Sequence, residues 1–223
     1  SWFGDEVTPA QFQKDLAALG DIDNLDIFIN SPGGDVFAGI TIYNMLKRHK
    51  AAKTVHVDGL AASSASIVAM AGDRVVMPKA ATLMIHNAWA LVGGNKARIR
   101  AIADELERVD GQLAGIYAER TGKSPEVVAQ WMDEERWMSG EEALADGFAD
   151  EIEQNKQIAA CSDVDKYFRH YKNAPPIAED GEETPQPVSD MKQEPDPEPG
   201  EAGSTMRDQR KRFAEIRKKI VEV

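Results

Sequence analysis

Short β-rich segments alternate with helical ones over the first 157 residues, and this alternation restricts the fold more than any other feature. Leu25–Asn30 and Thr54–Val57 are short and rich in β-branched residues, which predicts buried strands. Val36–His49 and Lys96–Arg120 place apolar residues three and four positions apart, which predicts amphipathic helices. Strands that alternate with helices pair mainly in parallel, so we predict a layered α/β domain.

The remaining expected elements fit the same alternation. We predict further helices at Thr8–Leu19, Ser63–Ala71, Ser124–Met132 and Ser139–Asp146, and further strands at Arg74–Met77 and Thr82–His86.

The chain changes in composition after residue 157. Residues 174–203 contain seven of the eleven prolines, and residues 178–202 carry nine acidic side chains against one base, Lys192. Such a segment cannot bury enough apolar surface to offset the entropy lost on ordering. We therefore predict three parts: a folded domain over 1–157, a largely disordered acidic linker over 158–203, and a basic amphipathic helix over 204–223.

The amino-acid composition argues against several classes of binding partner and several cellular locations. The net charge of -12 disfavours binding to nucleic acid or to an anionic membrane. No apolar run is long enough for a membrane span, and no signal peptide is visible. Cys161 is the single cysteine, which rules out an internal disulfide and favours a reducing compartment such as the cytoplasm. Because the sequence opens at Ser1 without Met, we expect an upstream segment to be missing.

Two strand-to-helix turns and one strand end carry residues suited to nucleophilic catalysis. Residues 29–35 contain a Gly-Gly turn whose amides could approach a ligand closely. Residues 59–66 place Ser63, Ser64 and Ser66 at a predicted helix start, where a serine is either an exposed nucleophile or an ordinary helix cap. His86 ends an apolar strand, where α/β proteins place reactive groups, although a lone histidine there is more often a hydrogen-bonded structural residue than a base. These patterns alone do not choose among the serines.

An acidic cluster supplies candidates for a third catalytic residue. Asp133, Glu134 and Glu135 precede Arg136 and Trp137, and a serine–histidine pair needs a carboxylate to orient the imidazole. A charge run of this kind is more often simply a solvated helix end. No group of residues has the spacing of metal ligands, and no phosphate-binding or dinucleotide motif is present, so we expect no metal and no cofactor.

In this order and spacing, these segments resemble the ClpP family of serine peptidases. The resemblance runs from about residue 2 to residue 153, roughly two thirds of the chain. It rests on INSPGGDVFAGITIYNML (29–46), GLAASSAS (59–66), AGDRVVMP (71–78), LMIHNA (83–88), TGKSPE (121–126) and ERWMSGEEALADGFAD (135–150). It implies a crotonase-like spiral of ββα units with a protruding handle helix at Lys96–Arg120, a homo-oligomeric ring and a polypeptide substrate.

The resemblance also assigns roles to individual residues. It implies Ser63 as nucleophile, His86 as general base and acid, and an oxyanion hole formed by the backbone N–H groups of Gly34 and Ser64. Gly33, with a strand around Gly93 and Gly94, would flank an extended substrate. The family usually has Asp two residues before the aromatic residue. This chain has Glu135 there, with Asp133 as the alternative.

The C-terminal extension departs from housekeeping members of that family. An acidic linker followed by a basic helix is similar to phage-encoded ClpP-like proteases of head assembly. This similarity implies a prohead protease in the bacterial host cytoplasm or the procapsid, whose last helix binds a capsid, portal or scaffold partner. Dependence on an AAA+ unfoldase is not determined by the sequence. The competing interpretations are an inactive assembly protein with the same fold, a crotonase-type acyl-CoA enzyme and a Ser–Lys peptidase.

Overall fold

The computed structural model describes residues 7–153, 171–173 and 220–222. Within them the strands are β1 (Asn24–Ser31), β2 (Ala52–Ala62), β3 (Arg74–Pro78), β4 (Thr82–Ile85), β5 (Arg136–Ser139), β6 (Glu151–Glu153) and β7 (Ile220–Glu222). The helices are α1 (Pro9–Ala18), α2 (Val36–Arg48), α3 (Ser64–Ala69), α4 (Lys96–Thr121), α5 (Pro125–Asp133) and α6 (Gly140–Asp146). The predicted α/β class and the order of its elements are confirmed.

Strand β2 organises the curled sheet. It pairs in parallel with β1 from Ala52 onward. Its first half pairs with β3 through Thr54–His56, and its last residues pair with β4 through Leu60–Ala62. Among the described strands, β4 and β5 form the antiparallel pair, and the other pairs are parallel, as predicted. The short strands β5 and β6 were not predicted, because they contain only two and one apolar residues, respectively.

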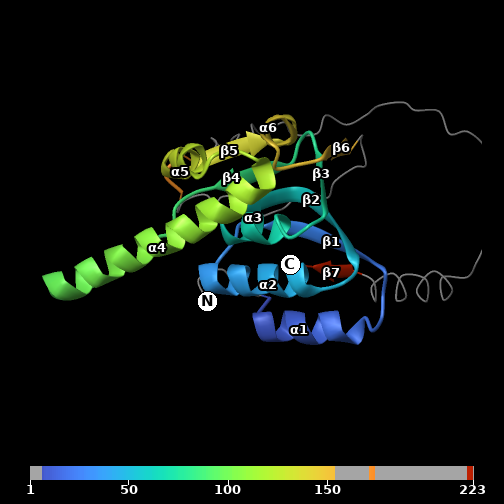
Figure 1. Cartoon of the computed structure of the whole chain (residues 1–223), viewed down its shortest axis with the longest axis horizontal. Helices are drawn as coiled ribbons and strands as arrows, with labels where there is room; N and C mark the ends of the chain where they lie inside the picture. The colour runs from blue at the N-terminus through green and yellow to red at the C-terminus, as the bar shows by residue number, and fades with distance from the viewer. Residues whose placement is uncertain (1–6, 154–170, 174–219, 223) are drawn as a thin grey trace, which may run out of the picture.

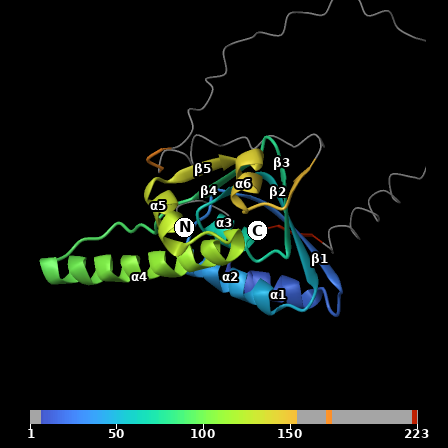
Figure 2. The same cartoon turned by 45° about the horizontal axis from the view of Figure 1, so that its top comes forward.

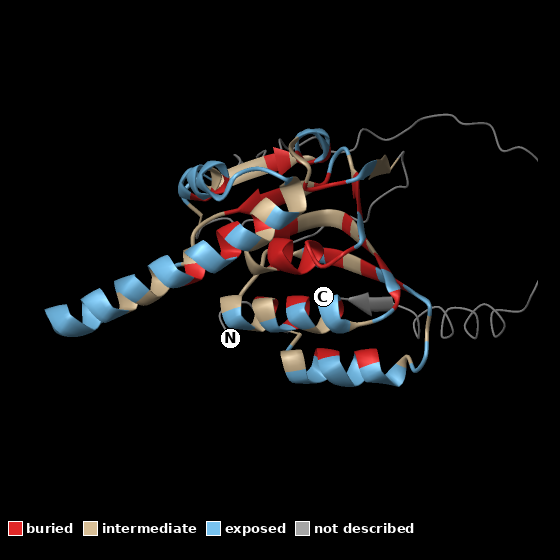
Figure 3. Cartoon of the chain, viewed as in Figure 1, coloured by how far each residue is buried: buried red, intermediate tan, exposed pale blue. Residues whose placement is uncertain are grey.

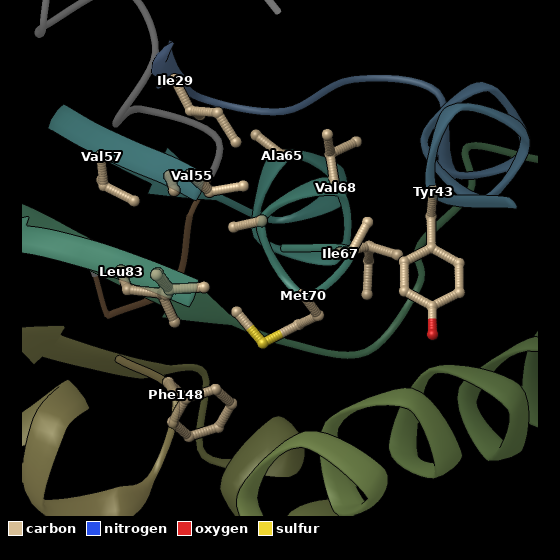
Figure 4. Packing of buried hydrophobic residues seen from close by; sticks show 14 of the residues in the cluster. Ile29, Tyr43, Val55, Val57, Ala65, Ile67, Val68, Met70, Leu83 and Phe148 are labelled. Atoms are coloured by element: carbon tan, nitrogen blue, oxygen red, sulfur yellow. The ribbon is translucent and has the colours of Figure 1, made fainter. Parts of the chain in front are cut away.

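Helix α3 lies at the centre of the hydrophobic core. Ala65 through Ala69 are all buried, so this helix contacts protein on every side. Figure 4 shows Ile67 of α3 facing Tyr43 of α2, while Val55, Val57 and Leu83 approach α3 from the sheet. A small-residue helix fits this position because it allows the neighbouring layers to approach closely.

Helix α4 packs through one half and projects from the body through the other. Its buried residues are Val109, Leu113, Ala114 and Tyr117, all in the C-terminal half. Figures 1 and 2 show the N-terminal half extending beyond the rest of the domain, and Figure 3 shows that half as largely exposed. This arrangement matches the handle helix expected at Lys96–Arg120. Of the described helices, none is long and apolar enough to cross a membrane.

The C-terminal extension lies mostly outside the described residues. In the predicted linker over 158–203, the structure describes Tyr171–Asn173. In the predicted helix over 204–223, it describes Ile220–Glu222, which form β7 and pair in parallel with Asp26–Phe28 of β1. The helix prediction is therefore wrong at these three residues. Without β7, this edge of β1 would leave its backbone N–H and C=O groups unpaired. The β-branched sequence Ile-Val favours a strand that pairs with them.

Two glycines in helices provide a test of the packing around α3. A Cβ added to Gly39 in α2 would lie 2.8 Å from Ser64 Cβ and 3.0 Å from Ser64 O, whereas one added to Gly111 in α4 meets nothing within 4 Å. We expect Gly39→Ala to lower the free energy of unfolding by about 1–3 kcal/mol through overpacking. Gly111→Ala should raise it by up to about 1 kcal/mol through helix propensity. Urea denaturation at one fixed protein concentration measures both, and equal effects would contradict the close contact.

Candidate active site

Ser63 occupies a strained turn between the end of β2 and the start of α3. Its backbone has φ 54° and ψ -127°, a combination that is costly for a residue with a Cβ. Three hydrogen bonds hold it there. The Ser63 N–H donates to Met84 O at 3.0 Å, and the Ser66 N–H and hydroxyl donate to Ser63 O at 3.0 and 2.6 Å. The surrounding strand and helix therefore impose this conformation.

The Ser63 hydroxyl pairs with His86 instead of capping its helix. Ser63 is the N-cap of α3 but makes no capping hydrogen bond, and its Oγ lies 2.8 Å from His86 Nε2. The pairing follows from strand register, because Ala62 of β2 lies opposite Met84 of β4 and both side chains follow just beyond these strand ends. Ser66 instead is buried, with its hydroxyl 2.7 Å from the Tyr117 hydroxyl. Of the three candidate serines, Ser63 is therefore the one placed against the histidine.

The environment of His86 favours the neutral imidazole. Burial lowers the pKa of His86 below its ordinary value, and the negative charge of Glu135 raises it in part. Near neutral pH the ring is therefore unprotonated and able to accept a proton from Ser63.

The Gly-Gly turn packs directly against the serine turn. Gly33 has φ +90°, and a Cβ there would lie 2.6 Å from Ala62 O and 2.8 Å from Ser63 Cβ. Only glycine fits this approach. Gly34 and Ser64 both line the cavity beside Ser63. Each amide lies where a helix begins, at a position whose N–H has no partner within the helix.

A cavity of about 690 Å³ opens next to the Ser63–His86 pair. Its apolar wall includes the exposed side chains of Phe37, Trp89 and Leu91, the last 83% exposed. Gly33, Gly93 and Gly94 are not among its lining residues. The strand expected around Gly93 and Gly94 is absent, since this part of the described chain is a loop leading into α4. Both glycines are exposed.

The Glu135 carboxylate lies close enough to His86 to raise the pKa of the imidazole, but the hydrogen bonds that it accepts come from other residues. The residue has φ 51°, and its carboxylate accepts from the Trp137 indole at 3.3 Å. It also accepts from the backbone N–H groups of Lys172 and Asn173, at 3.0 and 2.6 Å. The alternative acid, Asp133, accepts from Asn87 Nδ2 at 2.7 Å. Neither carboxylate is hydrogen-bonded to His86, and Glu135 is the one that acts on its pKa.

The other predicted polar features lie away from this site. His49 accepts a hydrogen bond from Ala51 N, and His56 stacks on Phe28 with ring centroids 4.8 Å apart. His170 lies outside the described residues. In the described part of the chain, no group of three His, Cys, Asp or Glu residues is arranged to hold a metal ion.

Two residues near the site were missed by the sequence analysis. Asp110 of α4 accepts from the Ala88 N–H at 2.7 Å and so anchors the loop after His86. Tyr171 lines the cavity with its ring against His86, their centroids 5.4 Å apart. Neither belongs to a motif, and Tyr171 lies in a stretch without helical or strand periodicity, so no sequence signal identified them.

Comparison with known proteins agrees with this geometry. The family model described as Clp protease matches residues 6–156. The chain is 34% identical over 157 residues to the ATP-dependent Clp protease proteolytic subunit 3 of Streptomyces coelicolor, covering 68% of this chain and 72% of that protein. It is 36% identical over 141 residues to the proteolytic subunit of Leuconostoc citreum, covering 61% and 70%. The corresponding subunit of Pleurastrum terricola is 34% identical, covering 63% and 73%. The chain therefore belongs to the Clp protease family.

Proposed function

We propose that this protein is a serine endopeptidase that hydrolyses peptide bonds through an acyl-enzyme on Ser63. The observation that carries the proposal is the 2.8 Å contact between Ser63 Oγ and His86 Nε2, in a cavity that Gly34 and Ser64 also line. Membership of the Clp protease family supports a polypeptide substrate.

The reaction follows from the positions of these groups. His86 Nε2 accepts the hydroxyl proton as Ser63 Oγ attacks the peptide carbonyl, and the proton then passes to the leaving amine. The N–H groups of Gly34 and Ser64 would stabilise the negative charge on the carbonyl oxygen. Water, activated by His86, hydrolyses the resulting ester and regenerates Ser63. The cavity beside Ser63 would hold the side chain next to the cleaved bond.

Glu135 is our choice for the third member of the catalytic set. Its charge favours the imidazolium that forms when Ser63 attacks. Asp133, which is hydrogen-bonded to Asn87, is the alternative. Because neither acid is hydrogen-bonded to His86, a weak or inactive enzyme that serves as an assembly protein is the second candidate function.

The wider setting is also a proposal. The projecting half of α4 would contact other subunits in a homo-oligomeric ring, as in the family that the sequence resembles. We further propose a prohead protease acting in the host cytoplasm or procapsid. The support is the acidic proline-rich extension, which lies beyond the family match ending at residue 156, and the basic amphipathic pattern after it.

Labelling with a fluorophosphonate tests the nucleophile. We expect the wild-type protein to be labelled and Ser63→Ala to be unlabelled, with peptidase activity reduced by about 10⁴-fold or more. Ser64→Ala is the matched control, because it keeps the backbone N–H and should still be labelled. Persistent labelling of Ser63→Ala would overturn the assignment, and an unlabelled wild type would favour the assembly protein.

The pH dependence of kcat/KM tests His86 and its acid. Activity should fall with decreasing pH through the His86 pKa, which lies below the ordinary 6.5 because the ring is buried. Glu135→Gln removes the charge that raises this pKa, so the acidic limb should move to still lower pH while kcat/KM falls about 10²-fold or more. Glu134→Gln is the control for the neighbouring charge and should leave the limb in place. If Asp133→Asn moves the limb and Glu135→Gln does not, Asp133 is the acid.

Binding to purified capsid and portal proteins tests the role of the extension. Replacing Phe213 and Ile216 by Asp breaks the apolar stripe of the predicted terminal helix without altering Ile220–Glu222. We expect the double variant to lose binding at least about 10-fold while Ser63 labelling stays unchanged. Equal binding by both proteins would remove the proposed partner surface.

A further inference from the structure

Three residues of the C-terminal extension lie against the catalytic centre. Tyr171, Lys172 and Asn173 follow the family match by fifteen residues or more, yet each contacts the site. The Tyr171 hydroxyl donates to Pro32 O at 2.5 Å, next to the Gly-Gly turn. The amide side chain of Asn173 donates to Glu134 O at 2.8 Å. We refer to Tyr171–Asn173 as the strap.

The strap supplies most of the hydrogen bonds that hold the candidate acid. Among the described residues, three N–H groups donate to the Glu135 carboxylate: two are the backbone amides of Lys172 and Asn173, and the third is the Trp137 indole. A carboxylate that accepts three hydrogen bonds is held in one orientation. The position of Glu135 beside His86 therefore depends on residues outside the family domain.

The tyrosine ring of the strap covers the imidazole. It meets His86 edge-on and Trp137 edge-on, in both cases with centroids 5.4 Å apart. Burial and the Glu135 charge raise the pKa of Tyr171 to about 12, and the hydrogen bond with the Ser63 side chain opposes them in part. The phenol therefore stays neutral, and its O–H can donate to Pro32 O. Burial is also the main cause that lowers the pKa of His86. Tyr171 provides part of that burial.

The cavity shows that the strap forms a wall of the site and does not fill it. Gly34, Ser63, Ser64 and His86 all line a cavity of about 690 Å³, and Tyr171 is another of its lining residues. A segment that blocked the nucleophile would separate Ser63 from this space. We propose that Tyr171–Asn173 is a positioning segment, which orients the Glu135 carboxylate through two backbone N–H groups and shields His86 with the Tyr171 ring. This inference rests on the proposed serine peptidase function.

Variants at Tyr171 test the shielding. Tyr171→Ala exposes the imidazole, so the pKa of His86 should rise toward its ordinary value and the acidic limb of kcat/KM should move to higher pH. This direction is opposite to that expected for Glu135→Gln. Tyr171→Phe keeps the ring but loses the hydroxyl, with its hydrogen bonds to Pro32 O and to the Ser63 side chain. Because the ring still covers the imidazole, the acidic limb of kcat/KM should stay close to that of the wild type. The other charged groups around His86, namely Glu135, Asp133 near Asn87 and Asp110 near Ala88, are unchanged in both variants.

Variants at Asn173 test the backbone donors. Asn173→Pro removes the N–H that lies 2.6 Å from Glu135, whereas Asn173→Ala keeps it and loses only the side-chain contact to Glu134 O. We expect Asn173→Pro to lower kcat about 10-fold or more with little change in KM, as for the loss of a hydrogen bond to a charged group. Asn173→Ala should be close to wild type. Circular dichroism on all four variants establishes that they are folded.

A titration of the His86 ring by NMR in wild type, Tyr171→Ala and Tyr171→Phe separates this inference from the proposed function, because it needs no activity. If the wild type is not labelled by fluorophosphonate but the Tyr171→Ala titration moves upward, the peptidase proposal fails and the shielding stands. An unchanged His86 titration in Tyr171→Ala overturns the shielding. Equal kcat values for Asn173→Pro and Asn173→Ala would overturn the positioning role. A higher kcat/KM for Tyr171→Ala than for the wild type would also overturn it, and would identify Tyr171–Asn173 as an inhibitory segment.

Discussion

The left-handed backbone of Ser63 is the constraint on which the site depends. A residue with a Cβ adopts φ 54° only when its surroundings leave no alternative, and here β4 and α3 both hold its peptide groups. The turn aims Oγ away from the helix start and toward His86. Without this conformation, Ser63 would cap α3 as serines at helix N-termini commonly do.

Close packing around this turn brings the two loops of the site together. Gly33 lies against Ala62 and Ser63, and Gly39 lies against Ser64, in both cases so closely that an added Cβ would come within 3.0 Å of a neighbouring atom. The turn before α2 and the turn before α3 therefore act as one unit. Tyr117 of α4 adds a further tie, because its buried hydroxyl bonds to Ser66, which in turn holds Ser63 O. The packed half of the projecting helix is thus connected to the serine turn.

Electrostatics at His86 reflect a balance between burial and one nearby charge. Burial disfavours the imidazolium and is the larger effect, while Glu135 favours it. The same carboxylate is held mainly by Lys172 and Asn173. A Glu at this position has a longer side chain than an Asp, and the strap supplies donors that hold that side chain. The orientation of Glu135 therefore depends on Lys172 and Asn173, which lie beyond the family domain.

The sequence predicted the elements of the domain well because their periodicities are long and strong. Lys96–Arg120 matched α4 to within one residue, and Val36–His49 matched α2 equally well. Predictions were less complete where few residues carry the signal. The part of β2 that follows Val57 was not predicted to be strand. Strands β5 and β6 were missed because they contain too few apolar residues. The prediction of a terminal helix was wrong at Ile220–Glu222, because these residues pair with β1 despite the helical spacing of the apolar residues in this segment.

By itself the sequence determined the α/β class, the order of elements and a small set of candidate residues, because hydrophobic periodicity and turn residues act locally. Local pattern left Ser63, Ser64 and Ser66 equivalent, since each is a serine at one helix start, and the family resemblance selected Ser63. The tertiary structure supplies the physical reason for that choice, through the register of β2 and β4 and the strain at Ser63. Only the tertiary structure placed Tyr171 at His86, because that contact joins segments 85 residues apart and no local pattern encodes it.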